Sequence, residues 1–165
     1  MTNVTAGAYA DIPLFLFHLL EYLDVEFEID VDDINQRWAQ AASVDVWSQL
    51  VLKDTRGIAE QLTSAPRTGV YRFDEDGEIT FARWGNDWHS LHDETEAFFL
   101  RVLAPGDYTY PGADLGMLVA RSRVEDDGGR LTDRACQWIA GVHSQFAGTP
   151  VAEQPVAGAL AFTSG

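Results

Sequence analysis

Three side chains near the middle of the chain, His89, His92 and Glu96, have types and a spacing that could bind a divalent metal ion. Two imidazoles and one carboxylate form the facial triad of non-haem iron sites. On a continuous helix, at about 100° per residue, the three would lie within roughly 60° of one another. However, Ser90 could be the N-cap of this helix, and His89 would then lie outside it. The alternative is a solvated polar cluster, so the metal site is a hypothesis.

A second set of polar side chains alternates with apolar ones in Val-Glu-Phe-Glu-Ile-Asp-Val-Asp, residues 25–32. Period two is typical of a strand with one buried and one exposed face. The apolar residues would face the core, and the acids would form a row roughly 6.6 Å apart. Such a row repels itself unless water or a cationic group faces it. It is either an edge strand protected by charge or a surface for a basic protein. The predicted partner-binding residues are Glu26, Glu28, Asp30 and Asp32, with Trp88 as an interface anchor if it is exposed.

The remaining polar residues do not form a catalytic pattern. His18 and His143 lie in apolar helical patterns, and no serine lies in a Gly-x-Ser-x-Gly motif. We therefore assign no catalytic residue, predict no cofactor, and expect a non-catalytic protein rather than an enzyme.

The charge of the chain restricts its partners. Its 165 residues carry 26 acids and 11 bases, a formal charge of −15 at pH 7. Nucleic acids and anionic membranes bind basic surfaces, so neither is expected to bind directly. A basic protein partner fits this charge, as does a saline environment.

The first element that the sequence predicts is a helix over residues 12–23, which is apolar around nearly its whole circumference. Such a helix belongs at the centre of a domain or against another subunit, which makes a homo-oligomer through this helix a possibility. The apolar run is too short to cross a bilayer and lacks a preceding basic region, so we expect a cytoplasmic protein. Asp32 or Asp33 is expected to cap a short helix that follows.

Further along, the residues around Gly77 predict a hairpin of two strands, residues 70–74 and 78–84. Helical spacing of apolar residues predicts helices within 43–62, from Ser90 to Val102, over 113–124, and after a Thr132 cap. The predicted fold class is therefore α+β. A small, mainly antiparallel sheet of about three strands (25–32, 70–74 and 78–84) is covered by several helices. Residues 1–146 would form one globular domain, and 147–165 a loosely ordered tail.

Three functions remain open from the sequence. The first is a non-catalytic acidic protein that binds a basic partner, as inhibitors and immunity proteins do. The second is a structural subunit of a larger assembly such as a virus particle, and the third is a metal enzyme using the His/His/Glu cluster. All three are analogies from charge, size and spacing.

Overall fold

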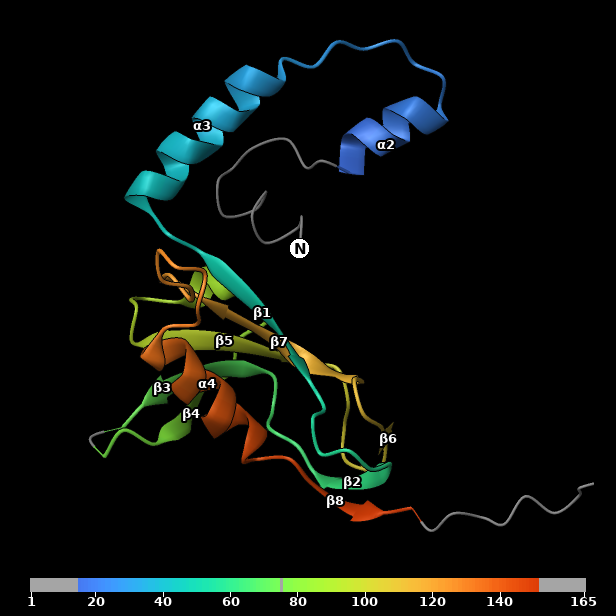
Figure 1. Cartoon of the computed structure of the whole chain (residues 1–165), viewed down its shortest axis with the longest axis vertical. Helices are drawn as coiled ribbons and strands as arrows, with labels where there is room; N and C mark the ends of the chain where they lie inside the picture. Colours follow the sequence, from blue (N-terminus) through green and yellow to red (C-terminus); the bar gives the residue numbers. More distant parts are fainter. Residues whose placement is uncertain (1–14, 75, 152–165) are drawn as a thin grey trace, which may run out of the picture.

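The structure is a computed structural model that describes residues 15–74 and 76–151 (Figure 1). The described chain is mostly sheet. A five-stranded antiparallel sheet, sheet A, has the order β1 (Ser48–Lys53), β7 (Asp114–Ala120), β5 (Glu96–Arg101), β3 (Gly69–Phe73), β4 (Ile79–Arg83). A three-stranded antiparallel sheet, sheet B, has the order β6 (Tyr108–Thr109), β2 (Glu60–Ser64), β8 (Ala147–Pro150). The helices of the described residues are α2 (Phe15–Tyr22), α3 (Val31–Val44), α4 (Asp133–His143) and a 3₁₀ turn, η1 (Trp88–Ser90).

The predicted fold class is therefore wrong. Two sheets of five and three strands replace the small three-stranded sheet, and three α-helices in the described chain replace the larger helical cover. Residues 25–30 have no regular structure and Val31 begins α3, so the first predicted strand is absent. The regions 43–62, 90–102 and 113–124 contain strands where helices were expected.

The helix predictions for residues 90–102 and 113–124 failed because β5 and β7, two central strands of sheet A, are buried on both faces. Phe98 and Phe99 are adjacent in β5 and are 2% and 0% exposed. In β7, Leu118 and Val119 are likewise both buried. A strand covered on both faces loses the alternation of apolar and polar residues, and its apolar run then resembles one side of a helix.

The main core lies between the inner face of sheet A and α4. Trp138 and Val142 of α4 are 1% and 0% exposed and pack with Tyr71 and Phe99 of the sheet. Leu62 of β2 and Phe146, which precedes β8, extend the same core toward sheet B. This arrangement explains why the region predicted as a tail begins with an ordered strand: β8 pairs with β2 over residues 147–150.

Two local predictions are confirmed. β3 and β4 form the expected hairpin, with Gly77 at φ 80° in its turn. Only glycine adopts this left-handed backbone conformation without a steric penalty. The last helix also begins where expected, because the hydroxyl of Thr132 accepts a hydrogen bond from the amide of Ala135 at 3.2 Å.

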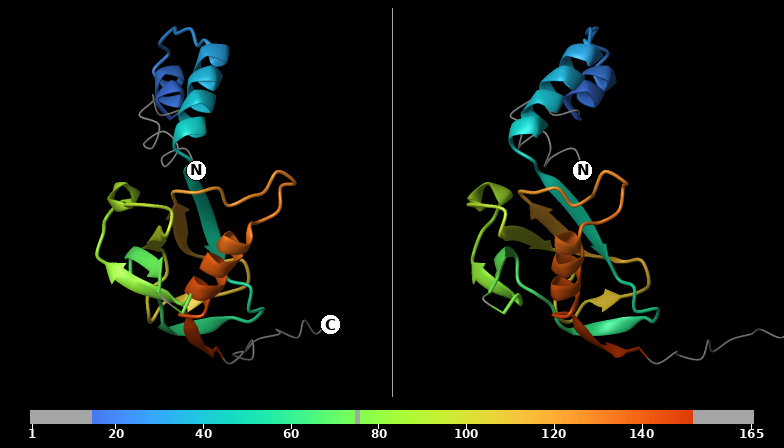
Figure 2. Two further views of the ribbon diagram at one scale, coloured as in Figure 1. Left: turned by 90° about the vertical axis from the view of Figure 1, so that its left-hand side faces the viewer. Right: turned by 60° about the vertical axis from the view of Figure 1, so that its left-hand side comes forward.

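The N-terminal helices lie apart from this core. In the three ribbon views α2 and α3 lie together at one end of the molecule, beyond both sheets (Figures 1 and 2). No described residue before Leu52 is buried. The expectation that the first helix is central is therefore wrong. The predicted start of that helix, at residue 12, lies outside the described residues.

Candidate interaction surface

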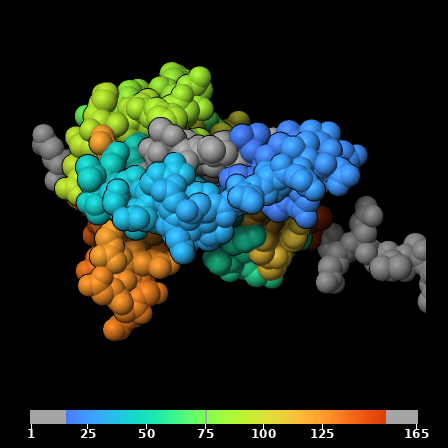
Figure 3. Space-filling view, turned by 90° about the horizontal axis from the view of Figure 1, so that it is seen from above, coloured from blue at the N-terminus to red at the C-terminus, as the bar shows by residue number. Residues whose placement is uncertain are grey.

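We name residues 15–45 the acidic arm: α2, the link 23–30, α3 and its C-cap Asp45. Between Glu21 and Asp45 the arm has eight carboxylates and a single base, Arg37. It also exposes nine large apolar side chains: Leu16, Leu19, Tyr22, Leu23, Val25, Phe27, Ile29, Val31 and Val44. Seen from above, the arm crosses the top of the molecule (Figure 3).

The link begins with a tight helix ending. The amide of Val25 donates to the carbonyl of Leu20 at 3.0 Å, and the amide of Asp24 donates to that of Glu21 at 3.1 Å. These two bonds form a Schellman motif, with Asp24 in the left-handed conformation at φ 55°. The motif ends α2 and changes the chain direction, so the acidic and apolar residues of the link lie outside the helix.

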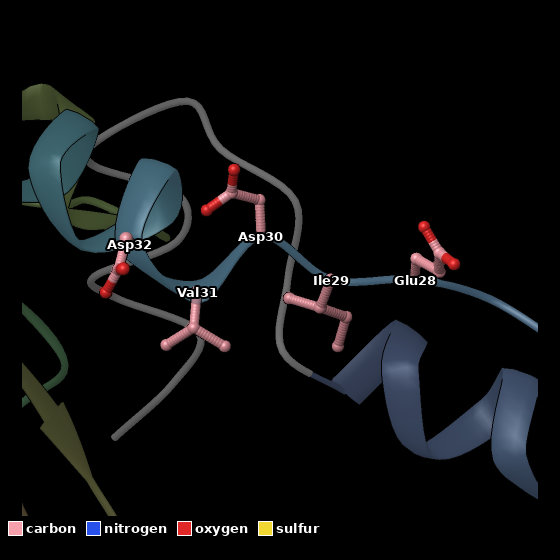
Figure 4. Close-up of a pocket in the computed structure, with 5 residues that line it drawn as sticks. All are labelled: Glu28, Ile29, Asp30, Val31 and Asp32. Carbon is pink, nitrogen blue, oxygen red and sulfur yellow. The ribbon is translucent and has the colours of Figure 1, made fainter.

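Along the link, side chains alternate between two directions although no strand forms. Glu28 and Asp30 point to one side of the backbone, and Ile29 and Val31 point to the other (Figure 4). The apolar side chains do not enter the core, since Val25 is 46% and Val31 58% exposed. The prediction that they face a core is wrong.

The four carboxylates that were expected to form one row on a strand lie in different elements. Glu26 and Glu28 lie in the link, Asp30 is the N-cap of α3, and Asp32 lies in the first turn of that helix. Asp30 accepts a hydrogen bond from the amide of Asp33 at 2.9 Å. This cap satisfies a helix amide that would otherwise lack a partner, so helix formation begins at Val31, before the predicted caps Asp32 and Asp33.

Apolar contact and open hollows shape the surface of the link. The rings of Phe17 in α2 and Phe27 stack with their centroids 5.8 Å apart. A hollow of about 630 Å³ is lined by residues 28–32, and another of about 420 Å³ by residues 26–28. The described lining of both hollows consists only of acidic and apolar side chains, which is a surface suited to a basic and partly apolar ligand.

A polar joint connects the arm to sheet A. Asp45 accepts hydrogen bonds from Arg121 Nε at 2.7 Å and from Trp47 Nε1 at 2.9 Å. The Arg121 guanidinium also lies 5.7 Å from the Trp47 ring centroid, and it lowers the pKa of Asp45. Because Arg121 directly follows β7, these contacts fix the point at which α3 meets the sheet.

The predicted metal ligands lie in different surroundings from those expected. Glu96 is the first residue of β5, so the three residues do not share one helix. Both oxygens of Glu96 bind the guanidinium of Arg83, with Nη2 to Oε2 at 2.7 Å, and Oε2 also accepts the amide of His92 at 3.0 Å. Arg83 holds the pKa of Glu96 at about 2.

The two histidines have separate carboxylate neighbours. His92 Nδ1 lies 3.7 Å from Glu96, whereas His89 Nδ1 lies 3.6 Å from Asp87. Within the described ranges, no group of three or more His, Cys, Asp or Glu residues is arranged to hold a metal ion. In this fold the carboxylate of Glu96 is therefore the binding partner of Arg83.

Trp88 is half-buried on the outer face of sheet A, the face opposite α4. It packs, with Trp47, on a cluster of buried apolar side chains, and His89 stacks on its ring at 5.2 Å. Its indole N–H is buried, with no hydrogen-bond partner among the described residues. The cluster beneath it consists of Val70, Leu91, Phe98 and Val119.

The sequence did not predict a buried ionic network at the junction of the two sheets. Asp54 is 2% exposed and accepts two bonds from the Arg56 side chain, at 3.1 and 2.8 Å, and one from the Thr109 hydroxyl at 2.6 Å. Arg56 Nη1 also lies 2.6 Å from Glu60 Oε2. Arg56 strongly lowers the pKa of Asp54. Burial lowers the pKa of the nearby His143. No periodic pattern relates these residues, and no sequence signal indicated them.

No family model matches the chain, and neither a curated protein nor a solved structure does. Among the helices that the structure describes, none combines the length and the apolar character that a bilayer crossing requires.

Proposed function

We propose that the protein is a non-catalytic interaction protein that binds a basic protein partner through the acidic arm, as an inhibitor or immunity protein would. One observation carries the proposal: eight carboxylates and nine exposed large apolar side chains occur on an arm in which none of residues 16–45 is buried.

The two kinds of side chain have different roles in such a complex. Exposed apolar side chains provide the area whose removal from water favours association. The carboxylates increase the association rate of a basic partner and repel acidic ones, which gives selectivity. Neither role requires a strand, so the proposal does not depend on the geometry that the sequence predicted.

The test begins with the full chain immobilised and exposed to a cell lysate at low salt. Each retained protein is identified, purified and titrated against two variants with the same change in charge. The arm variant carries Glu26→Gln, Glu28→Gln, Asp30→Asn and Asp32→Asn. Asparagine at position 30 keeps an N-cap. The control variant neutralises four exposed carboxylates of the sheet region, Asp76, Glu78, Glu94 and Glu125.

We expect a basic partner that binds the arm variant about tenfold or more weakly than the wild type, because the variant loses four exposed charge pairs with that partner. The control variant should bind like the wild type, and added salt should weaken the complex. Equal binding of the arm variant and the wild type would refute the proposal, as would the absence of any partner that distinguishes the two variants.

A further inference from the structure

Two arginines lie close together at the end of sheet A where β5 ends and the antiparallel strand β3 begins. Arg101 is the last residue of β5, and its amide donates to the hydroxyl of Thr68, just before β3, at 3.1 Å. Arg67 precedes Thr68, and its carbonyl accepts a hydrogen bond from the Tyr71 hydroxyl at 2.9 Å. Burial raises the pKa of Tyr71, and the charges of Arg67 and Arg101 both oppose that rise. The two guanidiniums therefore lie near the same hydroxyl group.

Neither of these arginines has a carboxylate partner. Among the described residues no ion pair includes Arg67 or Arg101, whereas six other bases each pair with a carboxylate. The surrounding segments also lack acids, although the chain has 26: residues 61–73, 79–86 and 97–106 contain none. Two like charges close together repel each other, and an anion bound to both would replace that repulsion by attraction.

An exposed indole ring adjoins the two arginines. Trp84 directly follows β4 and is 68% exposed. The guanidinium of Arg67 lies 5.7 Å from the centroid of this ring, and the Phe81 ring packs against it in a T-shaped arrangement at 5.3 Å. An indole that is held by a neighbouring ring and open to water provides a rigid apolar surface beside the two charges.

We infer that Arg67, Arg101 and Trp84 form a binding site for a small phosphate monoester that carries a flat apolar group. A phosphate monoester has a charge of about −1.5 to −2 at pH 7, which matches two guanidiniums better than the single charge of a carboxylate does. Guanidiniums bind phosphate oxygens through paired N–H donors. The apolar group of the ligand covers the exposed face of the indole.

The charge of the whole chain favours a small ligand at this site over an acidic macromolecule. A large acidic partner approaches many of the 26 carboxylates and is repelled by them. A small molecule contacts mainly the surface that lacks acids, and salt screens the more distant charges.

The site is separate from the acidic arm. The arm leads into β1 at Ser48, which is in register with Ala97 near the start of β5, whereas Arg101 is the last residue of that strand. The phosphate site and the proposed arm complex can therefore be tested separately, and either can fail without the other.

Nuclear magnetic resonance on the full, isotope-labelled chain tests the inference. Phenyl phosphate, benzoate and inorganic phosphate are titrated at constant ionic strength and about pH 7.5, where a phosphate monoester is mostly doubly charged. Phenyl phosphate should shift the amide signals of Thr68 and Arg101 and the indole signal of Trp84 until they saturate. Benzoate has the smaller charge and inorganic phosphate lacks the ring, so both should bind more weakly.

Two substitutions and a matched control locate the site. Arg67→Gln and Arg101→Gln should each weaken phenyl phosphate binding about tenfold, because each removes charge-assisted hydrogen bonds to the phosphate. Arg130→Gln makes the same change at an exposed arginine before α4 that forms no ion pair among the described residues, and should leave binding unchanged. Arg67 is exposed, so Arg67→Gln decides the result if circular dichroism shows that Arg101→Gln does not fold. The absence of saturable shifts with phenyl phosphate would overturn the inference, as would tighter binding of benzoate or an equal loss with Arg130→Gln.

Discussion

Asp30 and Glu96 belong to the two polar motifs that the sequence suggests for binding, yet each has a structural task in the fold. Asp30 caps α3, and Glu96 binds the Arg83 side chain and the His92 amide. Both tasks satisfy backbone or charged groups that would otherwise lose water on folding. A carboxylate in a sequence motif can therefore serve as a hydrogen-bond acceptor within the fold as readily as it can bind a metal ion or a partner.

The Glu96 contacts predict a specific pH dependence. The folded-state pKa of Glu96 is about 2, lowered from 4.5 by Arg83, so folding favours the ionised form. Its stabilisation is fully present above the unfolded pKa and is lost as pH falls through about 2. Glu96→Gln should reduce the free energy of unfolding by about 2 kcal/mol at pH 7. The deficit should shrink below pH 4.5.

Urea denaturation between pH 2 and 7 measures this difference. Glu94→Gln, an exposed neighbour whose side chain is not part of these contacts, is the control and should change stability little at any pH. A deficit for Glu96→Gln that is the same at all pH values would show that the charge of Glu96 is not what stabilises the fold.

At the scale of secondary-structure elements, the contacts around Asp54 connect the two sheets. Asp54 follows β1, and its side chain binds Arg56 in the next loop and Thr109 of β6. Arg56 in turn approaches Glu60 at the start of β2. The amide of Asp54 donates to Ala113 and its carbonyl accepts from Gly112, both at 2.8 Å. The carboxylate of Asp54 thus connects the Arg56 loop with β6, and its backbone binds residues 112 and 113.

Asp54→Ala should therefore lower the free energy of unfolding by about 3 kcal/mol, because it leaves Arg56 partly buried without its main partner. Urea denaturation followed by circular dichroism measures the change. Asp114→Ala is a suitable control, since it removes a carboxylate paired with Lys53 at the surface and should cost less than about 1 kcal/mol. Equal losses for the two variants would contradict a special role for the buried site.

The sequence predicts elements well where their signals are local. The turn at Gly77 and the cap at Thr132 require only neighbouring residues, and both are confirmed. β5 and β7 depend on what covers them, because burial on both faces removes the strand pattern. In the candidate surface, the sequence located the acidic and apolar residues of 25–32. It could not show that they lie in a link and a helix start, since alternation does not reveal whether a partner strand exists.

At the scale of the whole molecule, charge is distributed unevenly between the arm and the sheets. Eight of the 26 acids lie in residues 15–45, and no side chain whose burial the structure describes there (16–45) is buried. Repulsion among these charges destabilises the compact state and is not offset there by a core. Added salt reduces this repulsion over distances beyond about 10 Å at 0.1 M.

Salt should therefore stabilise the protein. The midpoint of thermal unfolding is expected to rise as sodium chloride increases from about 20 mM to about 500 mM, by roughly 2–4 °C for each kcal/mol of reduced repulsion. The fourfold arm variant, with a formal charge of −11, should begin at a higher midpoint and rise less. The variant with four neutralised sheet carboxylates has the same charge and separates the effect of location from that of total charge. A midpoint that falls with salt would mean that ion pairs such as Arg83–Glu96 outweigh the net repulsion.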